Sequence, residues 1–458
     1  MLILKFGGAS LADVANFENS LSWVLRQDQV VVVVSAMKGV TNQLLECLSH
    51  AENREHERFN DILDSMRLKH DQVIERLVEE PELTNMRISS LFLEARTLLQ
   101  GVASLCEITP RAHDRLVSLG EKLSARIFAA ILNSKGRKAE PIDGESILIT
   151  DKRFGNASPF LDTSKQLCEK LLLPLLREDV VPVVSGFTGS TEDGLTTTLG
   201  RGGTDLSASM VAQCLNADEC WFLKEVDGIM SSDPRVVSEA HTLGEMSYRE
   251  VAELSFFGAK VLHPIAIQPL KKAGITARIL NVYNPDFGGT VVSSKVQRLN
   301  IAAKAISCMS DIGLITIEGD GMQGVVGLAA RVFQAAAKVQ ANVLMISQSS
   351  SEQNLCLVVK DEDAKNVVDT LNSELELEIF KGLVDSVSLR SDQTIISLVG
   401  EGMTGCPGVS GKLFSILGEY GINVSMIAQG SSEVNISFLI QDEMVSKAMV
   451  AIHRGLEL

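Results

Sequence analysis

The sequence is poor in aromatic residues, has no excess of positive charge and contains no long apolar run. Aromatic side chains make up 5% of its 458 residues, so aliphatic side chains must build the cores. The 42 lysines and arginines stand against 58 aspartates and glutamates, which gives a net charge of −16. An acidic protein repels phosphates overall, and we therefore expect no nucleic-acid partner. A polyphosphate ligand would need a local cradle of cations and backbone N–H groups.

The eight cysteines are scattered, with no C-x-x-C pair and no histidine pair nearby. We therefore expect neither a disulfide framework nor a zinc site. The longest aliphatic block, Val30–Val34, has the length of a strand, whereas a membrane-spanning helix needs about 20 apolar residues. The apolar run at the N-terminus is too short for a signal peptide. These features predict a cytoplasmic protein with no membrane partner and no metal-ligating side chains.

The first 40 residues alternate between apolar runs, a glycine turn and a helical pattern, which is typical of an α/β layer with a parallel sheet. Residues 42–135 are predicted to be almost wholly helical, and strand patterns return at 180–185, 219–223 and 277–282. Turn-forming residues gather at 283–300, where we place the main boundary. The sequence therefore predicts an α/β domain over residues 1–295, with an open and mostly parallel sheet.

The residues after this boundary contain an internal repeat. Gly319 aligns with Gly400 and Gln348 with Gln429, at a constant offset of 81 positions without a gap. Each copy follows the order strand, helix, strand, strand, helix, which is typical of a ferredoxin-like βαββαβ domain. The first copy spans 312–390 and has a fourth strand pattern at 383–389. The second spans 391–458 and lacks one, so we expect the strand pattern at 302–309 to complete it.

Both copies contain the glycine pattern G-x-G-x-x-G between a strand and a helix, starting at Gly319 and Gly400. This pattern also occurs in dinucleotide sites. A copy of about 80 residues is too small for a doubled nucleotide-binding fold, however, and its second strand ends on glutamine instead of the acidic residue that binds a ribose. We interpret these glycines as turns that let a small ligand approach backbone N–H groups.

Glycine-rich segments in the first 205 residues carry the chemistry. In KFGGAS (5–10), Lys5 ends a strand before Gly7, Gly8 and a helix start, which offers a cation and free N–H groups to a phosphate; an ordinary βα turn is the alternative. SGFTG (185–189) follows a buried strand, where α/β sheets bind ligands. In TTLGRGGTD (197–205), Arg201 could clamp a carboxylate or form a surface ion pair. Asp205 could orient lysine ammonium groups and organise a metal–phosphate assembly.

These segments resemble a known family. KFGGAS, SAMKGVTN (35–42), SLGEKLSA (118–125), SGFTG, TTLGRGGTD, KEVDGIMSSDPR (224–235) and FGAKVLHP (257–264) occur in the order found in aspartokinases, and the repeat resembles their paired ACT regulatory domains. The resemblance covers essentially the whole chain. It implies an amino-acid-kinase α/β/α sandwich followed by two ACT domains, at 312–390 and 391–458. It also implies transfer of the ATP γ-phosphate to the β-carboxylate of L-aspartate, at the entry to lysine, threonine and methionine synthesis.

The chemistry agrees with this resemblance. A carboxylate acceptor is already ionised at pH 7 and needs no general base, so catalysis depends on positioning and on cations around the phosphoryl group. By resemblance, Lys5 and Asp205 are catalytic, and Arg201 and Glu121 would pair the α-carboxylate and the α-ammonium of aspartate. Thr41 and Phe187 complete that site. The resemblance implies Mg²⁺ and an ATP site at Gly7, Gly8, Ser10, Lys224, Glu225, Met230, Arg235 and Lys260.

Some positions depart from the family pattern. Lys224-Glu225 stands where many members carry Thr-Asp, and Met230 where many carry Tyr. Backbone contacts to adenine would survive this, but the usual aromatic packing would not. Ala9 for Thr and Thr204 for Ser are mild changes.

By resemblance, the repeat binds an amino-acid effector, threonine or lysine, and joins the chain into a homodimer or homotetramer through its ACT domains. The effector positions that this implies are Met322, Gly327, Asn342, Gln348 and Gln429. For Met322 and Gly327, a role in packing and in a turn is the alternative.

Two other functions stay open at this point. One is another acid kinase of the same fold, which turnover of glutamate would reveal. The other is an amino-acid sensor without catalytic activity, which would be expected to have lost Lys5, Arg201 or Asp205; all three are present. Some aspartokinases continue into a homoserine dehydrogenase after the repeat. Because the sequence stops at Leu458, we expect the kinase alone.

Overall fold

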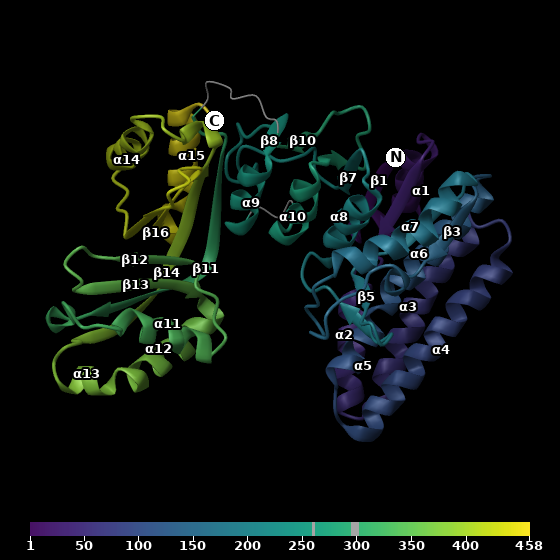
Figure 1. Cartoon of the computed structure of the whole chain (residues 1–458), viewed down its shortest axis with the longest axis horizontal. Coiled ribbons are helices and arrows are strands. Elements are labelled where there is room, and N and C mark those ends of the chain that lie inside the picture. Colours follow the sequence, from purple (N-terminus) through teal and green to yellow (C-terminus); the bar gives the residue numbers. More distant parts are fainter. Residues whose placement is uncertain (259–261, 295–301) are drawn as a thin grey trace. The chain divides into compact units, whose positions relative to one another are not determined.

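The computed structural model describes residues 1–258, 262–294 and 302–458, which form two compact units (Figure 1). The first unit contains residues 1–229, 242–252 and 262–294. The second contains residues 230–241, 253–258 and 302–458. Two segments that lie before residue 260 in the chain therefore pack with the C-terminal repeat.

The first unit is built on an eight-stranded sheet with the order β3-β4-β2-β1-β7-β9-β10-β8. β1 pairs in parallel with β2 on one side and with β7 on the other, and only β9 and β10 pair antiparallel within this sheet. This agrees with the predicted open and mostly parallel sheet. The strands are β1 (Leu2–Phe6), β2 (Val30–Val34), β3 (Ala139–Ile142), β4 (Val181–Ser185), β7 (Glu219–Lys224), β8 (Glu245–Ser247), β9 (Thr276–Asn281) and β10 (Thr290–Ser293).

Helices surround this sheet, and five of them, α2 to α6, fill the region predicted to be helical (Figure 1). Asp13 caps α1 by accepting the N–H of Asn16, and Thr109 caps α5 in the same way, with Pro110 as the first helical residue. The helices are α1 (Val14–Leu25), α2 (Val40–Glu52), α3 (His56–Leu77), α4 (Pro81–Leu105), α5 (Pro110–Val117), α6 (Leu119–Ser134), α7 (Leu161–Arg177), α8 (Gly203–Leu215), α9 (Tyr248–Phe256) and α10 (Pro264–Ala273). The last part of α9, from residue 253, belongs to the second unit. The short strands β5 (Thr188–Ser190) and β6 (Thr196–Thr198) form a separate antiparallel pair.

The core of the first unit is mainly aliphatic, as the low aromatic content requires. All five valines of β2 are buried, which is typical of a parallel strand that is covered on both faces. A few phenylalanines fill the space between the sheet and the helices. The ring of Phe128 lies 5.5 Å from that of Phe6 and 6.1 Å from that of Phe17.

The second unit is built on a six-stranded antiparallel sheet with the order β12-β13-β11-β14-β16-β15. Its two long central strands run through both copies of the repeat. The N-terminal part of β11, Ala305–Met309, pairs with Ile395–Val399, and the part from Ile312 to Glu318 pairs with residues 386–393. The strands are β11 (Ala305–Glu318), β12 (Met345–Gln348), β13 (Asn354–Lys360), β14 (Ser386–Val399), β15 (Met426–Gln429) and β16 (Asn435–Gln441).

This pairing concerns the expectation that the strand pattern at 302–309 completes the second copy. Residues 305–309 lie beside the strand of the second copy, and the strand continues as one element, β11, into the first copy, with a shift of register between Met309 and Ile312. The helices of this unit are α11 (Leu328–Lys338), α12 (Asp361–Glu374), α13 (Glu376–Phe380), α14 (Val409–Glu419) and α15 (Val445–Leu456). Among the residues that the structure describes, no helix is long and apolar enough to cross a membrane.

Candidate active site

A cavity of about 240 Å³ lies in the first unit, near the carboxyl ends of the strands β1, β2 and β4. Open parallel sheets bind their ligands at this edge, because the loops that follow neighbouring strands meet there. The cavity is lined by Lys5, Ser35, Thr41, Glu121, Phe187, Gly200, Arg201, Gly202, Gly203, Thr204 and Asp205. Every residue that the sequence analysis assigned to catalysis or to the aspartate site lines it.

One carboxylate and two ammonium groups form the charged centre of the site. Nζ of Lys5 lies 2.6 Å from Oδ1 of Asp205, and Nζ of Lys224 lies 3.1 Å from Oδ2. Burial alone would raise the pKa of Asp205, but the two ammonium groups outweigh it and hold this pKa at about 2. Burial also lowers the pKa of Lys5, against the attraction of Asp205. The group carries one net positive charge, which suits an anionic ligand.

Glu121, on α6, is a second buried carboxylate at the cavity, and its side chain is 2% exposed. Burial raises its pKa to about 8, against hydrogen bonds from Ser35 and from backbone N–H groups. Its Oε2 atom has no hydrogen-bond partner within the described residues. A buried carboxylate with an unpaired oxygen is costly unless a cation arrives, so this position suits the ammonium group of a ligand.

The loop that carries Arg201 needs its glycines. Gly200 and Gly202 have φ of +71° and +73°, and a Cβ on Gly202 would lie 2.3 Å from Cβ of His263. Phe187 adopts a positive φ of 67° as a non-glycine residue, and its N–H donates to Oγ of Ser207 at 2.9 Å. Such strained backbone is typical of ligand sites. Arg201 makes no ion pair within the described chain, so its guanidinium is available to a carboxylate ligand.

The predicted phosphate-binding segment lies next to this centre. A Cβ on Gly7 would be 3.7 Å from Nζ of Lys5, and one on Gly8 would lie 2.8 Å from the carbonyl oxygen of Ala36. Only a bare backbone fits at Gly8 without a shift. The Ser10 side chain is buried and its hydroxyl lies 3.4 Å from the carbonyl oxygen of Leu223, so it contributes to packing.

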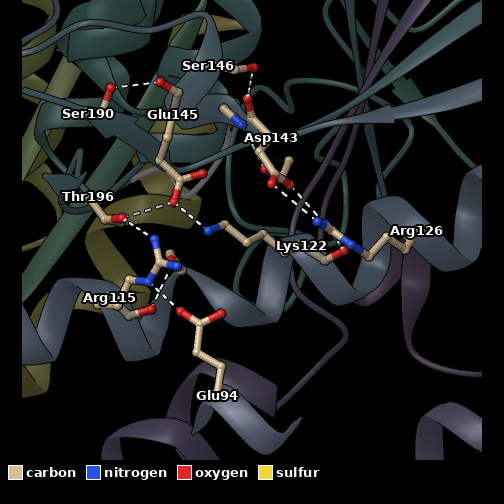
Figure 2. A network of polar contacts seen from close by, with 12 residues as sticks. Glu94, Arg115, Lys122, Arg126, Asp143, Glu145, Ser146, Ser190 and Thr196 are labelled. Atoms are coloured by element: carbon tan, nitrogen blue, oxygen red, sulfur yellow. Dashed lines mark hydrogen bonds and ion pairs between the residues drawn. The ribbon is translucent and has the colours of Figure 1, made fainter. Parts of the chain in front are cut away.

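The sequence did not predict a polar network that includes Lys122, the residue after Glu121 (Figure 2). Lys122, which follows Glu121 on α6, forms a buried ion pair with Glu145 at 2.6 Å. Asp114, which is fully buried on α5, accepts the N–H and the hydroxyl of Thr198, at the end of β6. The only signal for these residues was that Lys122 belongs to the segment SLGEKLSA. Its partner is 23 positions away, a pairing that requires the fold.

The other residues predicted to bind the nucleotide are divided between the two units. Lys224 belongs to the charged centre, whereas the next residue, Glu225, is exposed. Met230 and Arg235 lie in the second unit, within residues 230–241. The guanidinium of Arg235 is exposed and donates to both oxygens of Asp233, at 3.0 and 2.6 Å. Lys260 lies outside the residues that the structure describes.

The predicted effector residues all lie in the second unit. Met322 is 3% exposed and belongs to an apolar core with α11 and α12, which agrees with the packing alternative. Gly327 precedes α11 with a φ of +88°. Gln348 and Gln429 end the equivalent strands β12 and β15 and are exposed, as is Asn342. Gln348 and Gln429 therefore keep equivalent places in the two copies.

Comparisons with known proteins agree with this architecture. The model of the amino acid kinase family matches residues 1–281, and that of the ACT domain matches residues 315–375 and 396–456. The bifunctional aspartokinase/homoserine dehydrogenase 1 of Arabidopsis thaliana is 31% identical over 98% of the chain, and the chain spans about half, 50%, of its length. Aspartokinase 1 of the same plant is 31% identical over 99% of the chain and 79% of its own length.

Solved structures are similar over the whole chain. Aspartokinase III of E. coli in complex with aspartate and ADP is 32% identical, with a TM-score of 0.83 over 100% of both chains. The same enzyme in complex with lysine and aspartate is 31% identical, with a TM-score of 0.82 over 100% of this chain and 99% of that one.

The fold and the family model together define an amino acid kinase domain followed by two ACT domains. Within this class, the chain belongs to the aspartokinase family. The resemblance and the fold class predicted from the sequence are thereby confirmed.

Proposed function

We propose that the protein is an ATP-dependent aspartate kinase, which transfers the γ-phosphate of ATP to the β-carboxylate of L-aspartate and forms 4-phospho-L-aspartate. The observation that carries this proposal is the cavity that Lys5, Glu121, Arg201 and Asp205 line together. It has a cation and an anion for the two ends of an amino acid, next to a cationic centre for a phosphate. The similarity to E. coli aspartokinase III, whose structure contains aspartate and ADP, supports the same substrates.

Aspartate would bind through both charges of its amino-acid end. The guanidinium of Arg201 would pair the α-carboxylate, and the unpaired oxygen of Glu121 would accept the α-ammonium. Ionised Glu121 is required for this pair, so arrival of the ammonium lowers its pKa from about 8. Thr41 and Phe187 would close the sides of the cavity. The side-chain carboxylate would then point toward Lys5.

Phosphoryl transfer would depend on the charged centre. Lys5 and Lys224 would neutralise charge on the phosphoryl group, while Asp205 holds both ammonium groups at 2.6 and 3.1 Å. Backbone N–H groups at Gly7 and Gly8 would face the phosphates. The β-carboxylate oxygen forms the new P–O bond as the bond to the β-phosphate breaks and ADP leaves. Because this acceptor is ionised at pH 7, no side chain has to remove a proton.

The charged centre offers Mg²⁺ one carboxylate ligand, the side chain of Asp205. Mg²⁺ is usually held by one or two carboxylates together with substrate phosphates, and Asp205 is a suitable oxygen donor at the charged centre. When bound with the nucleotide, the ion would neutralise negative charge on the phosphates. No group of three or more histidine, cysteine or acidic side chains suited to a metal occurs in the described part of the chain.

The remaining nucleotide contacts are assigned by resemblance. Ser10, Glu225, Met230, Arg235 and Lys260 occupy the family's nucleotide-binding positions. Lys224 replaces the usual Thr and brings its charge to the triphosphate, whereas Met230 replaces an aromatic ring. We therefore expect ATP to be held more by its phosphates than by stacking of its base.

Regulation would come from the second unit. We propose that it binds lysine or threonine at Met322, Gly327, Asn342 and Gln348, with Gln429 as the equivalent residue of the second copy. The structure of E. coli aspartokinase III with lysine supports lysine as one candidate. Pairing of ACT domains between copies of the chain would form a homodimer or homotetramer. Feedback by either amino acid would fit an enzyme at the entry to lysine, threonine and methionine synthesis.

The product tests the proposal. Incubation with ATP, Mg²⁺ and L-aspartate should form an acyl phosphate, which ³¹P NMR resolves from ATP, ADP and inorganic phosphate. Glutamate in place of aspartate should give little or none. Addition of lysine or threonine should reduce the rate and thereby identify the effector. Binding of amino acids without formation of an acyl phosphate would overturn the kinase assignment in favour of a sensor.

A further inference from the structure

A buried ion pair joins α6, the helix that bears Glu121, to Glu145. Nζ of Lys122 is 2.6 Å from Oε1 of Glu145, and the two side chains are only 5% and 13% exposed. Lys122 directly follows Glu121 on α6, so the pair is fixed to the residue that faces the α-ammonium. Transfer of two charges out of water costs free energy that their attraction does not always return. We therefore expect this buried ion pair to have a role other than stabilising the fold.

The same pair also contacts the strand β6. Oε1 of Glu145 also accepts the hydroxyl of Thr196 at 3.2 Å, and Thr196 is the first residue of β6. This strand ends at Thr198, three positions before Arg201. Figure 2 shows the side chain of Glu145 between those of Lys122 and Thr196. Glu145 therefore connects the helix that bears Glu121 with the strand that leads to the Arg201 loop.

Further contacts hold Glu145 and Thr196 in place. The backbone carbonyl of Glu145 accepts the hydroxyl of Ser190 at 2.7 Å. The residue before it, Gly144, is packed so closely that a Cβ would lie 2.5 Å from the carbonyl oxygen of Ser185. Thr196 in turn accepts from Arg115 at 2.9 Å, and Arg115 is paired with Glu94 of α4 (Figure 2).

Another ion pair already holds α6 against the segment that contains Glu145. One helical turn after Lys122, the guanidinium of Arg126 donates to both oxygens of Asp143, at 2.9 and 3.2 Å. That second ion pair already ties α6 to the residues beside Glu145. What the Lys122–Glu145 pair adds to it is a connection from α6 to Thr196, on the strand that leads to Arg201. Asp114 and Arg115 contact the same strand from α5.

We propose that Lys122 and Glu145 are positioning residues that fix the separation of Glu121 from the Arg201 loop and thereby select the length of the amino-acid acceptor. This inference rests on the proposed function. An acceptor must satisfy Glu121 and Arg201 with its two charged groups and still bring its side-chain carboxylate to Lys5. These three residues line one cavity of about 240 Å³. If their separation is fixed for aspartate, the extra methylene of glutamate would misplace the reacting carboxylate. A misplacement of about 1 Å can cost about 100-fold in rate.

The test replaces both charges together, because removal of one partner leaves the other buried and unpaired. Lys122→Met/Glu145→Met should raise the KM for aspartate about ten-fold or more and leave the KM for ATP near its wild-type value. It should also lower the ratio of kcat/KM for aspartate over glutamate by about ten-fold, within the range that one methylene is worth. Lys122→Arg keeps the charge pair and should restore most of this selectivity.

Arg126→Gln/Asp143→Asn is the matched control, because it removes the neighbouring pair from the same helix and turn. It should lower the melting temperature while the selectivity stays at the wild-type value. If the Lys122→Met/Glu145→Met protein does not fold, Thr196→Val decides with the same measurements. It keeps the ion pair, removes the hydroxyl that contacts Glu145 and Arg115, and should shift the selectivity in the same direction.

Two results would overturn the inference alone: a folded double variant with the wild-type KM for aspartate and the wild-type selectivity, or an equal loss of selectivity in the control. A wild-type protein that neither binds nor phosphorylates aspartate would instead overturn the proposed function, and this inference with it. The wild-type reaction therefore separates the two failures.

Discussion

Replacement of Glu121 by glutamine should stabilise the first unit and at the same time weaken its binding of aspartate. Burial raises the pKa of Glu121 to about 8, from an ordinary value of 4.5. Because the folded pKa is the higher one, the folded protein retains this proton at pH values where the unfolded chain has lost it. The contribution to stability is complete below pH 4.5 and is lost as the pH rises through 8. At 1.36 kcal/mol per pKa unit, the loss is on the order of 5 kcal/mol.

Glutamine cannot ionise, so Glu121→Gln avoids this loss. The free energy of unfolding of the variant should match that of the wild type near pH 4.5 and should exceed it increasingly up to pH 8. Fluorescence during urea unfolding measures this in the first unit alone, because the two tryptophans of the chain, Trp23 and Trp221, both lie there. For the wild type, the KM for aspartate should fall as the pH rises from 6.5 to 8.5, since only ionised Glu121 pairs an ammonium.

Calorimetry measures the binding of aspartate, which is the second part of this prediction. Loss of a desolvated charge pair costs about 2–5 kcal/mol, so Glu121→Gln should weaken aspartate binding by roughly thirty-fold or more. Glu250→Gln is a matched control, because Glu250 is equally buried but its Oε2 accepts the N–H of Ser247 at 2.8 Å. It should gain no stability. The reasoning is refuted if Glu121→Gln is no more stable than the wild type at pH 8, or if it binds aspartate normally.

Three further changes test the charged centre and the aspartate site. Lys5→Ala should reduce kcat strongly and leave the circular dichroism spectrum unchanged, because the ammonium acts on the phosphoryl group; a near-normal kcat would exclude that role. Arg201→Ala should raise the KM for aspartate by roughly thirty-fold or more, as expected for a lost charge pair, with little effect on the KM for ATP. Removal of Mg²⁺ with EDTA should stop turnover, and added Mg²⁺ should restore it, whereas turnover in excess EDTA would contradict a metal–nucleotide substrate.

The cavity could be predicted from the sequence because each of its parts is a short contiguous segment. Lys5, Arg201 and Asp205 stand in glycine-rich stretches that carry their own structural signal. The ion pair of Lys122 with Glu145 has no such signal, since a pairing between segments 23 positions apart depends on the packed fold. The raised pKa of Glu121 was also beyond prediction, because it depends on burial by residues from several elements.

The layer architecture followed from apolar periodicity, and the duplication followed from the constant offset of the repeat. The membership of residues 230–241 in the second unit did not follow from either. This segment is polar and rich in turn residues, and its one fully buried apolar side chain, Val237, packs into the core of the second copy. Val236 and Ala240 pack against the same core, but so few apolar residues in a loop form no periodic pattern from which their partner could be predicted. For the same reason, sequence alone could not decide that Met322 is a core residue.

The rate of ADP release from ATP and Mg²⁺ with L-aspartate, and with L-glutamate in its place, tests the central claim most directly. The claim is that the spacing of Glu121, Arg201 and Lys5 around one cavity selects a four-carbon amino acid as phosphoryl acceptor. Turnover with aspartate, with a kcat/KM about ten-fold or more above that for glutamate, is the predicted result. Equal turnover of both, or none with aspartate, would contradict it.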